Sequence, residues 1–229
     1  MFGTDVETAA RQHADEMAPL ESCGIVVGNE YVPCNNVAED PFEDFLIPLR
    51  EYQTPLITGR LQAVIHSHPS GPAHPSEVDM AQQQEMQVPW GIIPGSAPMF
   101  WFGDQCPVPP LEGRVFRSGV ADCYSLFRDW WWLNRGVRLI NPPRPDSFWT
   151  KGLNLYMDNF QKAGFIRIDP AAAQEGDALL FQIRSKVVNH IGVYVGNNLM
   201  LHHLSIRLST HEPVTRWRSY LVMVLRYAG

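Results

Sequence analysis

The sequence has few cysteines, no cluster of basic residues and no uninterrupted apolar run long enough to cross a membrane. Four cysteines in 229 residues are too few and too scattered for a disulfide framework. A net charge of −6 argues against a generic phosphate-binding surface, so we expect no nucleic-acid partner. The apolar stretch at 88–102 is broken by Pro89, Pro94 and Pro98, so no membrane span is expected.

The beginning of the sequence is acidic and lacks the apolar segment of a signal peptide, so we expect synthesis in a reducing cytoplasm. Hydrophobic residues at 45% and charged residues at 18% describe an ordinary globular protein, and the length allows one large domain or two small ones. Residues 104–113 are rich in proline and form the natural boundary. We therefore predict a domain at 1–103, a linker at 104–113 and a domain at 114–229.

Hydrophobic periodicity predicts the elements of both halves. In the first half it indicates helices at 4–17 and 76–87 and strands at 23–28, 31–34, 45–49, 61–68, 90–93 and 99–102. In the second half it indicates helices at 122–134 and 148–160 and strands at 178–183, 190–196, 199–204 and 221–227. Consecutive tryptophans at 130–132 cannot all face one core, so one or two of them are expected to be exposed.

Two histidines, His66 and His68, stand two residues apart at the end of an apolar run. If that run is a β-strand, its side chains alternate and both imidazoles lie on one face. Pro69 ends the strand because it offers no N–H to a ladder, and Asp79 lies one turn into a helix that begins near Ser76. Two imidazoles and one carboxylate, with room for a water, are typical of a catalytic zinc site. The alternative is a hydrogen-bonded strand-end histidine and an ordinary helix cap.

The string His-x-His-Pro, followed by Pro-Ser-x-x-Asp, resembles the motif of the JAMM (MPN+) metalloproteases. This resemblance implies zinc held by His66, His68 and Asp79, with Ser76 steadying the tetrahedral intermediate. The family also uses a glutamate from an earlier segment, and Glu21 in Glu-Ser-Cys-Gly fits that setting. It would act as the general base that takes a proton from the attacking water, although a surface glutamate at a helix–strand junction is the ordinary alternative.

A second set of residues points to a cysteine nucleophile. Asp122 is expected to cap a helix in which Cys123 is the first residue, where the macrodipole favours the thiolate. His190 starts an apolar strand and His202 lies on the next one, so antiparallel pairing could place the two imidazoles together as a Cys/His/His triad. His203 would point to the opposite face, and the spacing after Gly196 favours His202 as the partner. Without these histidines, Cys123 would be read as a small buried apolar residue.

These residues resemble the NlpC/P60 family of papain-like cysteine peptidases over roughly 111–229. Asp-Cys at a helix start, Gly-Asp before a strand and His-Ile-Gly-Val-Tyr-Val-Gly match the pattern in order. The resemblance implies Cys123 as nucleophile, His190 as base and His202 as its partner. The segment at 114–121 departs from the pattern, because many cell-wall members carry a tyrosine and paired glycines there.

Together the two resemblances imply an α+β protein with two small domains. The first would be a JAMM-like mixed sheet with flanking helices, and the second a papain-like domain with a helix and an antiparallel sheet. This order of domains resembles the K-type tail assembly proteins at the tail tip of long-tailed bacteriophages.

The resemblance implies a dual peptidase, in which the cysteine half cleaves peptidoglycan stem peptides and the zinc half cleaves an amide or isopeptide bond. Other tail-tip proteins and peptidoglycan peptides would be the partners, in the host cytoplasm during assembly and then at the virion tail tip. Two alternatives stay open: a structural tail-tip component with silent sites, and a host cell-wall or ubiquitin-like processing enzyme.

Overall fold

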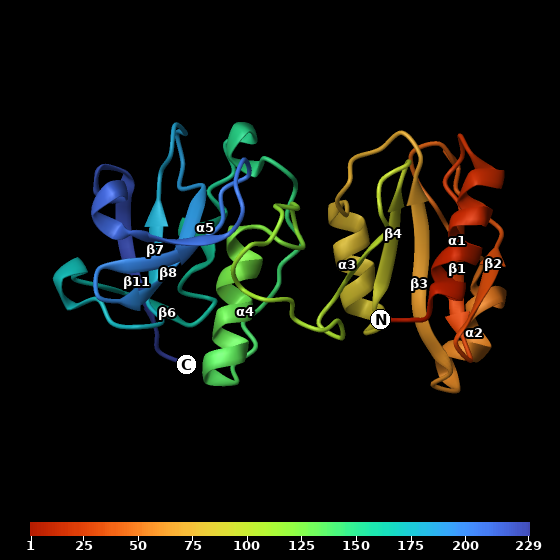
Figure 1. Ribbon diagram of the computed structural model, residues 1–229, viewed down its shortest axis with the longest axis horizontal. Helices are drawn as coiled ribbons and strands as arrows, with labels where there is room; N and C mark the ends of the chain where they lie inside the picture. The colour runs from red at the N-terminus through yellow and green to blue at the C-terminus, as the bar shows by residue number, and fades with distance from the viewer. The chain divides into compact units, whose positions relative to one another are not determined.

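The computed structural model describes residues 1–229 and divides them into two compact units, Met1–Pro107 and Val108–Gly229. Each unit has its own sheet, with helices packed against it (Figure 1). The two units together form a mixed α+β protein, which confirms the predicted fold class. No helix of the chain is both long and apolar enough to span a membrane.

The first unit is built on a five-stranded sheet with the strand order β2-β1-β3-β4-β5. Neighbouring strands are antiparallel except β3 and β4, which are parallel and are connected by the crossover helix α3. Its elements are α1 (Thr4–Met17), β1 (Cys23–Val27), β2 (Glu30–Cys34), α2 (Leu49–Ile57), β3 (Leu61–His68), α3 (Glu77–Met86), β4 (Trp90–Pro94) and β5 (Phe100–Phe102).

Alternation along β3 separates the core of this unit from its histidines. Ala63 and Ile65 are fully buried in a cluster with Val6 and Ala10 of α1, so this face of the strand is covered by the first helix. Side chains of even number on β3 point to the opposite face. The histidines near the carboxyl end of β3 therefore lie on the face away from α1.

The second unit is built on a six-stranded antiparallel sheet with the order β10-β9-β8-β7-β11-β6. Helix α4 packs on one face, where Leu126 and Phe127 meet Ile191 and Val193 of β8. Its elements are α4 (Cys123–Arg135), the 3-10 helix η1 (Phe148–Lys151), α5 (Leu155–Asn159), β6 (Phe165–Ile168), η2 (Pro170–Ala172), β7 (Ala178–Phe181), β8 (His190–Gly196), β9 (Leu199–His202), β10 (Thr210–Pro213), η3 (Val214–Tyr220) and β11 (Leu221–Tyr227).

The prediction for the three consecutive tryptophans is confirmed. Trp130 is 5% exposed and belongs to the core under α4, whereas Trp132 is 37% exposed. The guanidinium of Arg138 lies 4.0 Å from the centroid of the Trp132 ring. A cation over an aromatic face is favourable, so the exposed ring has a partner within its own unit.

Two predicted elements are wrong. The strand expected at 45–49 is irregular up to Pro48, and helix α2 begins at Leu49. In this irregular segment, the ring of Phe45 stacks on His66 with the ring centroids 4.3 Å apart. The helix expected at 148–160 is divided into η1 and α5, because Gly152 ends the first turn in the left-handed conformation with φ 74°.

Candidate active sites

The first candidate site lies at the carboxyl end of β3, where the chain turns toward α3. His66 and His68 are on one face of the strand, and both are buried, at 0% and 6% exposure. Between them Ser67 points to the other side, and its hydroxyl accepts a hydrogen bond from the Ser22 N–H at 2.8 Å. Helix α3 then brings Asp79 to the two imidazoles after a loop of eight residues, 69–76.

Three side chains converge at this point. The Nε2 atoms of His66 and His68 are 3.0 Å apart. Asp79 places Oδ1 3.4 Å from Nε2 of His66 and Oδ2 3.7 Å from Nε2 of His68. The three groups form a buried cluster that offers one ligand atom each, all within 4.8 Å of one another.

These distances are of the size that ligands of one metal ion require. Ligand atoms about 2.0–2.2 Å from a tetrahedral zinc ion are separated from one another by roughly 3.3–3.6 Å. The two imidazole nitrogens are 3.0 Å apart, and each lies 3.4 or 3.7 Å from a different oxygen of Asp79. The tautomer of His68 also suits a metal ligand. Its Nδ1–H donates to the Pro72 carbonyl at 2.8 Å, which leaves the lone pair on Nε2. The cluster is therefore compatible with a metal site.

The cap of α3 fixes the position of Asp79. Its N–H donates to the Ser76 hydroxyl at 3.0 Å, and its Oδ2 accepts from the Ser76 N–H at 2.7 Å, which together form a capping box. Burial alone would raise the pKa of Asp79, but His66 and the hydrogen bonds with Ser76 outweigh it and leave the pKa lowered. Ser76, predicted to steady an intermediate, is thus placed beside the cluster as the helix cap.

Glu21 lies just before β1 and reaches the same cluster, with Oε1 3.9 Å from Nε2 of His68. The carboxyl group is buried, which together with the negative charge of Asp79 raises the pKa of Glu21 to about 8. Burial and the neighbouring His66 lower the pKa of His68 to about 4. A carboxylate held at the edge of a ligand cluster is placed to exchange protons with a group bound there.

Two aromatic rings pack against His66, and no sequence pattern predicted them. Phe45 stacks on its imidazole, and Trp90 of β4 meets it edge-on with centroids 5.8 Å apart. Neither residue is near His66 in the chain, so no local pattern indicates the contact. His74 lies outside the cluster, with its Nδ1 3.1 Å from the Pro75 carbonyl oxygen.

The second candidate site begins at the first turn of α4. Asp122 caps the helix by accepting the Ser125 N–H at 2.7 Å, as predicted from its position. The same carboxylate is paired with Arg144, whose Nη2 lies 2.8 Å from Oδ2 with both side chains buried. Cys123, the first residue of the helix, is thereby held in a fixed place.

Cys123 is a thiol in this environment. Its Sγ lies 3.5 Å from the hydroxyl of Tyr156. Burial and the negative charge of Asp122 raise the pKa of Cys123 to about 11. Burial in a low-dielectric site therefore opposes the stabilisation of the thiolate expected at a helix N-terminus. A base has to remove the proton as the nucleophile reacts.

The two histidines of the predicted triad lie side by side on β8 and β9. Their strands are antiparallel neighbours, with Gly192 opposite His202, and Nε2 of His190 lies 3.0 Å from Nδ1 of His202. His203 follows the end of β9, where strand alternation no longer applies, and it lines the same cavity as Cys123 and His190 instead of facing away as predicted. Its ring meets Phe116 edge-on at 5.2 Å.

Sequence reasoning missed the residue that continues this chain, Glu212 of β10. Its Oε2 lies 3.2 Å from Nε2 of His202 and accepts the indole N–H of Trp217 at 2.6 Å, while Arg207 donates to Oε1 at 3.0 Å. Burial acts to raise the pKa of Glu212, but the bonds from Trp217 and Arg207 leave it lowered. The acidic side chain follows His202 by ten residues on the next strand, so only the strand pairing reveals it.

The charged end of this chain sets both tautomers. Because the Glu212 carboxylate only accepts, Nε2 of His202 carries the proton, and Nδ1 of His202 is then the acceptor for the Nε2–H of His190. Burial lowers the pKa of His202 to about 4 and that of His190 well below its usual value, so both rings are neutral at pH 7. His190 is left with its lone pair on Nδ1, as a general base requires.

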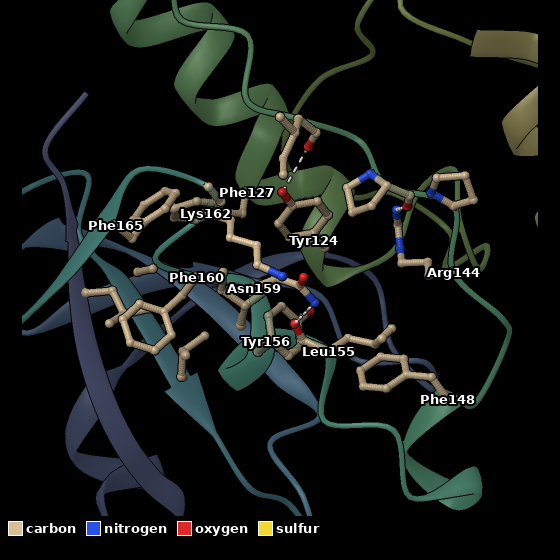
Figure 2. Close-up of a pocket in the computed structure, with 18 residues that line it drawn as sticks. Tyr124, Phe127, Arg144, Phe148, Leu155, Tyr156, Asn159, Phe160, Lys162 and Phe165 are labelled. Carbon is tan, nitrogen blue, oxygen red and sulfur yellow. Dashed lines mark hydrogen bonds between the residues drawn. The ribbon is translucent and has the colours of Figure 1, made fainter. Parts of the chain in front are cut away.

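Cys123 and His190 line one cavity of about 300 Å³. A second, mostly apolar cavity of about 340 Å³ lies between α4, the sheet and α5, and Figure 2 shows the residues that line it. Tyr156, Arg144 and Phe148 line both cavities. Tyr156 thus contacts the nucleophile with its hydroxyl and the apolar cavity with its ring.

Comparison with known families gives one match for each unit. Residues 3–103 match the model of prokaryotic homologs of the JAB domain, and residues 111–226 match the NlpC/P60 family. The fold and the sites define a two-domain protein in which a JAB-like domain is followed by an NlpC/P60 domain, both of which are related to peptidases.

Relatives extend over both domains. The chain is 40% identical over 162 residues to tail tip assembly protein K of Escherichia phage lambda, which covers 70% of this chain and 78% of that protein. It is 31% identical over 231 residues to tail tip assembly protein K of Escherichia phage N15, which covers 96% of this chain and 93% of that protein. The chain belongs to the family of tail tip assembly protein K.

Solved structures of low identity also match. The NlpC/p60 domain of the peptidoglycan hydrolase SagA is 14% identical, with a TM-score of 0.37, and the match covers 51% of this chain and 89% of that one. An NlpC/P60 family protein from Bacillus cereus ATCC 10987 is 13% identical, with a TM-score of 0.38, over 96% of this chain and 67% of that one.

Proposed function

We propose that this chain is a dual peptidase of the phage tail tip. The second unit would be a cysteine endopeptidase that cleaves peptidoglycan stem peptides, and the first a zinc metallopeptidase that cleaves an amide or isopeptide bond. The observation that carries the proposal is the hydrogen-bond chain from Glu212 through His202 to His190, which presents a neutral base to the cavity of Cys123.

In the second unit, Nδ1 of His190 takes the thiol proton as Sγ of Cys123 attacks the scissile carbonyl carbon. His190 becomes an imidazolium, and His202, backed by the negative Glu212, stabilises that charge through the Nε2–Nδ1 hydrogen bond. The proton then passes to the leaving amine, which breaks the amide bond and leaves a thioester on Cys123. Water deprotonated by His190 hydrolyses the thioester and restores the thiol.

In the first unit, His66, His68 and Asp79 would hold zinc, which when bound supplies Lewis-acid polarisation of the scissile carbonyl. Glu21 takes a proton from the attacking water and later gives it to the leaving amine. The Ser76 hydroxyl accepts the Asp79 N–H and keeps its own O–H for the developing oxyanion, in line with the steadying role predicted for it.

We place the protein in the host cytoplasm during tail assembly and then at the tail tip of the virion. The names of the relatives from phages lambda and N15 support this location and support other tail proteins as partners. In the particle, a wall-cleaving activity would open a path through peptidoglycan. In the assembling tail, the zinc site would act on a tail component.

The test is hydrolysis of purified peptidoglycan fragments by the full chain, compared with Cys123→Ala and His66→Ala. Loss of stem-peptide products with Cys123→Ala, but not with His66→Ala, is the expected result. If neither substitution changes the products, the enzymatic account of the second unit is wrong.

A structural tail-tip component with silent sites is the second candidate. The high pKa of Cys123, about 11, favours it, because few thiols in such a site are ionised at pH 7. Phage particles assembled with Cys123→Ala and His66→Ala chains separate the two accounts. Wild-type infectivity of both kinds of particle supports the structural role, and loss of infectivity with normal tail morphology supports the peptidase.

A further inference from the structure

The loop that connects β7 to β8 delivers an arginine to the cavity of the nucleophile. Residues 182–189 lead directly into His190, and Arg184 in this loop lines the same cavity as Cys123 and His190. The triad does not use this arginine. Its position beside the reacting groups raises the question of what its charge binds.

The loop is held in shape by its own side chains. The Asn189 carboxamide accepts the Ile183 N–H at 2.8 Å and donates to the Ile183 carbonyl at 3.1 Å, and the Gln182 side chain donates to the Ser185 carbonyl at 2.8 Å. Within this frame Arg184 adopts the left-handed conformation with φ 48°. The left-handed conformation is unfavourable for an arginine by itself, so the hydrogen bonds of the loop hold the Arg184 backbone in it.

The charges of the cavity lining do not cancel. Its charged residues at pH 7 are Arg144, Arg184 and Asp122, since His190 is neutral and Cys123 is a thiol. Arg144 is neutralised by three hydrogen bonds to Asp122. Two positive groups and one negative group leave a net charge of +1, and this charge belongs to Arg184, which is exposed and has no acidic partner in the chain.

We propose that Arg184 binds a carboxylate of the substrate beside the scissile amide, so that the second unit selects acidic peptides. A guanidinium matches a carboxylate with two parallel hydrogen bonds. Hydroxyl groups of Ser118 and Ser205 line the same cavity and add neutral donors. This inference rests on the proposed peptidase function for its use, but the positive charge beside Cys123 can be measured without any peptide substrate.

The first test compares alkylation of Cys123 by iodoacetate and by iodoacetamide in the full chain. The reagents differ by one negative charge, so the ratio of their rates reports the potential at Sγ. A unit positive charge near the thiol should favour the anion by about threefold. Arg184→Gln should lower the ratio by about threefold, and 0.5 M NaCl should shrink the difference between variants. The Cys123→Ala chain identifies the alkylation that belongs to other cysteines.

Lys186→Gln is the matched control, because Lys186 is an exposed cation of the same loop that does not line the cavity. It should leave the ratio close to that of the wild type. An equal effect of both substitutions, or no effect of Arg184→Gln, overturns the proposal.

The second test uses pairs of peptides that differ only in a carboxylate or a carboxamide next to the scissile bond. The wild type should favour the acid by about tenfold in kcat/KM, a typical value for a charge-assisted hydrogen bond. Arg184→Gln should abolish the preference, and Arg184→Lys should retain part of it. An acid preference that is unchanged in Arg184→Gln refutes the assignment.

The two failures are distinguishable. If no peptide is cleaved but the alkylation ratio still depends on Arg184, the proposed peptidase function fails and the anion site stands. If peptides are cleaved with no acid preference and the alkylation ratio does not respond to Arg184, the anion site fails and the proposed peptidase function stands.

Discussion

Replacing Glu212 with glutamine should remove the negative charge behind His202 and keep the hydrogen-bond chain that prepares His190. In the wild type, Oε1 accepts from Arg207 and Arg216, and Oε2 accepts from Trp217 and Arg207 and is bonded to His202. A carboxamide has only one accepting oxygen. The indole N–H of Trp217 only donates and lies 2.6 Å from Oε2, so that oxygen takes the place of Oε2 and still accepts from His202, while the partly exposed arginines turn away from the NH₂.

Both tautomers are then kept, and His190 still presents its lone pair on Nδ1. The imidazolium that forms when His190 takes the thiol proton loses the negative group that stabilises it through His202. A hydrogen bond to a charged group is roughly twice as strong as a neutral one, so kcat for peptide cleavage should fall by about tenfold. The cavity itself should be unchanged.

Two measurements check this expectation. Two-bond proton–nitrogen correlation spectra of the imidazole rings report which nitrogen is protonated, and His202 should stay protonated on Nε2 in Glu212→Gln. Alkylation of Cys123 by iodoacetamide should not fall, since the thiol stays accessible while hydrolysis slows. This combination separates loss of the stabilising charge from simple unfolding.

Glu112→Gln is the control, because Glu112 pairs with His211 at 3.2 Å but is 61% exposed and lies outside the chain to Cys123. It should have wild-type kinetics. The expectation is wrong if Glu212→Gln keeps the wild-type kcat, or if its loss of activity occurs with His202 protonated on Nδ1.

Three further results are expected. His68→Ala should lower the zinc content of the purified chain from about one equivalent to near zero by elemental analysis, whereas His74→Ala, outside the cluster, should not; equal zinc in both variants contradicts the assignment. Arg144→Met should lower the free energy of unfolding by about 3–5 kcal/mol in urea denaturation followed by tryptophan fluorescence, because it leaves buried Asp122 without its counter-charge; the exposed Arg218→Met should change it by less than about 0.5 kcal/mol. The rate of Cys123 alkylation by iodoacetamide should keep rising about tenfold per pH unit from pH 8 to pH 10, since its pKa of about 11 keeps it protonated below that pH, whereas a free thiol levels off near pH 8.5; a plateau below pH 8 would show a thiolate instead.

Short-range patterns were enough to locate the parts of both sites that lie on single elements. Alternation on β3 predicts that His66 and His68 share a face, and the Ser-x-x-Asp spacing predicts the cap that places Asp79. Strand pairing of two consecutive apolar segments predicts the neighbouring histidines of the second unit. In each case the relevant geometry is fixed by fewer than about fifteen residues of chain.

The missed groups depend on contacts between distant segments. Tyr156 reaches Cys123 across 33 positions of the chain, and Phe45 reaches His66 only after an irregular segment that the pattern assigned to a strand. Glu212 is close in sequence to His202, but its role depends on the register of β10 against β9. Periodicity does not determine register or the path of irregular backbone, so these residues could not be assigned beforehand.

The hydrogen-bond chain that supports His190 crosses the sheet from an inner strand to its edge. His190, His202 and Glu212 come from three adjacent strands, and the last of them, β10, is an outermost strand of the six. Outer strands detach at a lower free energy than the global unfolding of a domain. A mild denaturant should therefore abolish the acid–base chemistry of the second unit while most of its sheet is still intact, so that catalysis reports on a local opening that spectroscopic probes of the core do not detect.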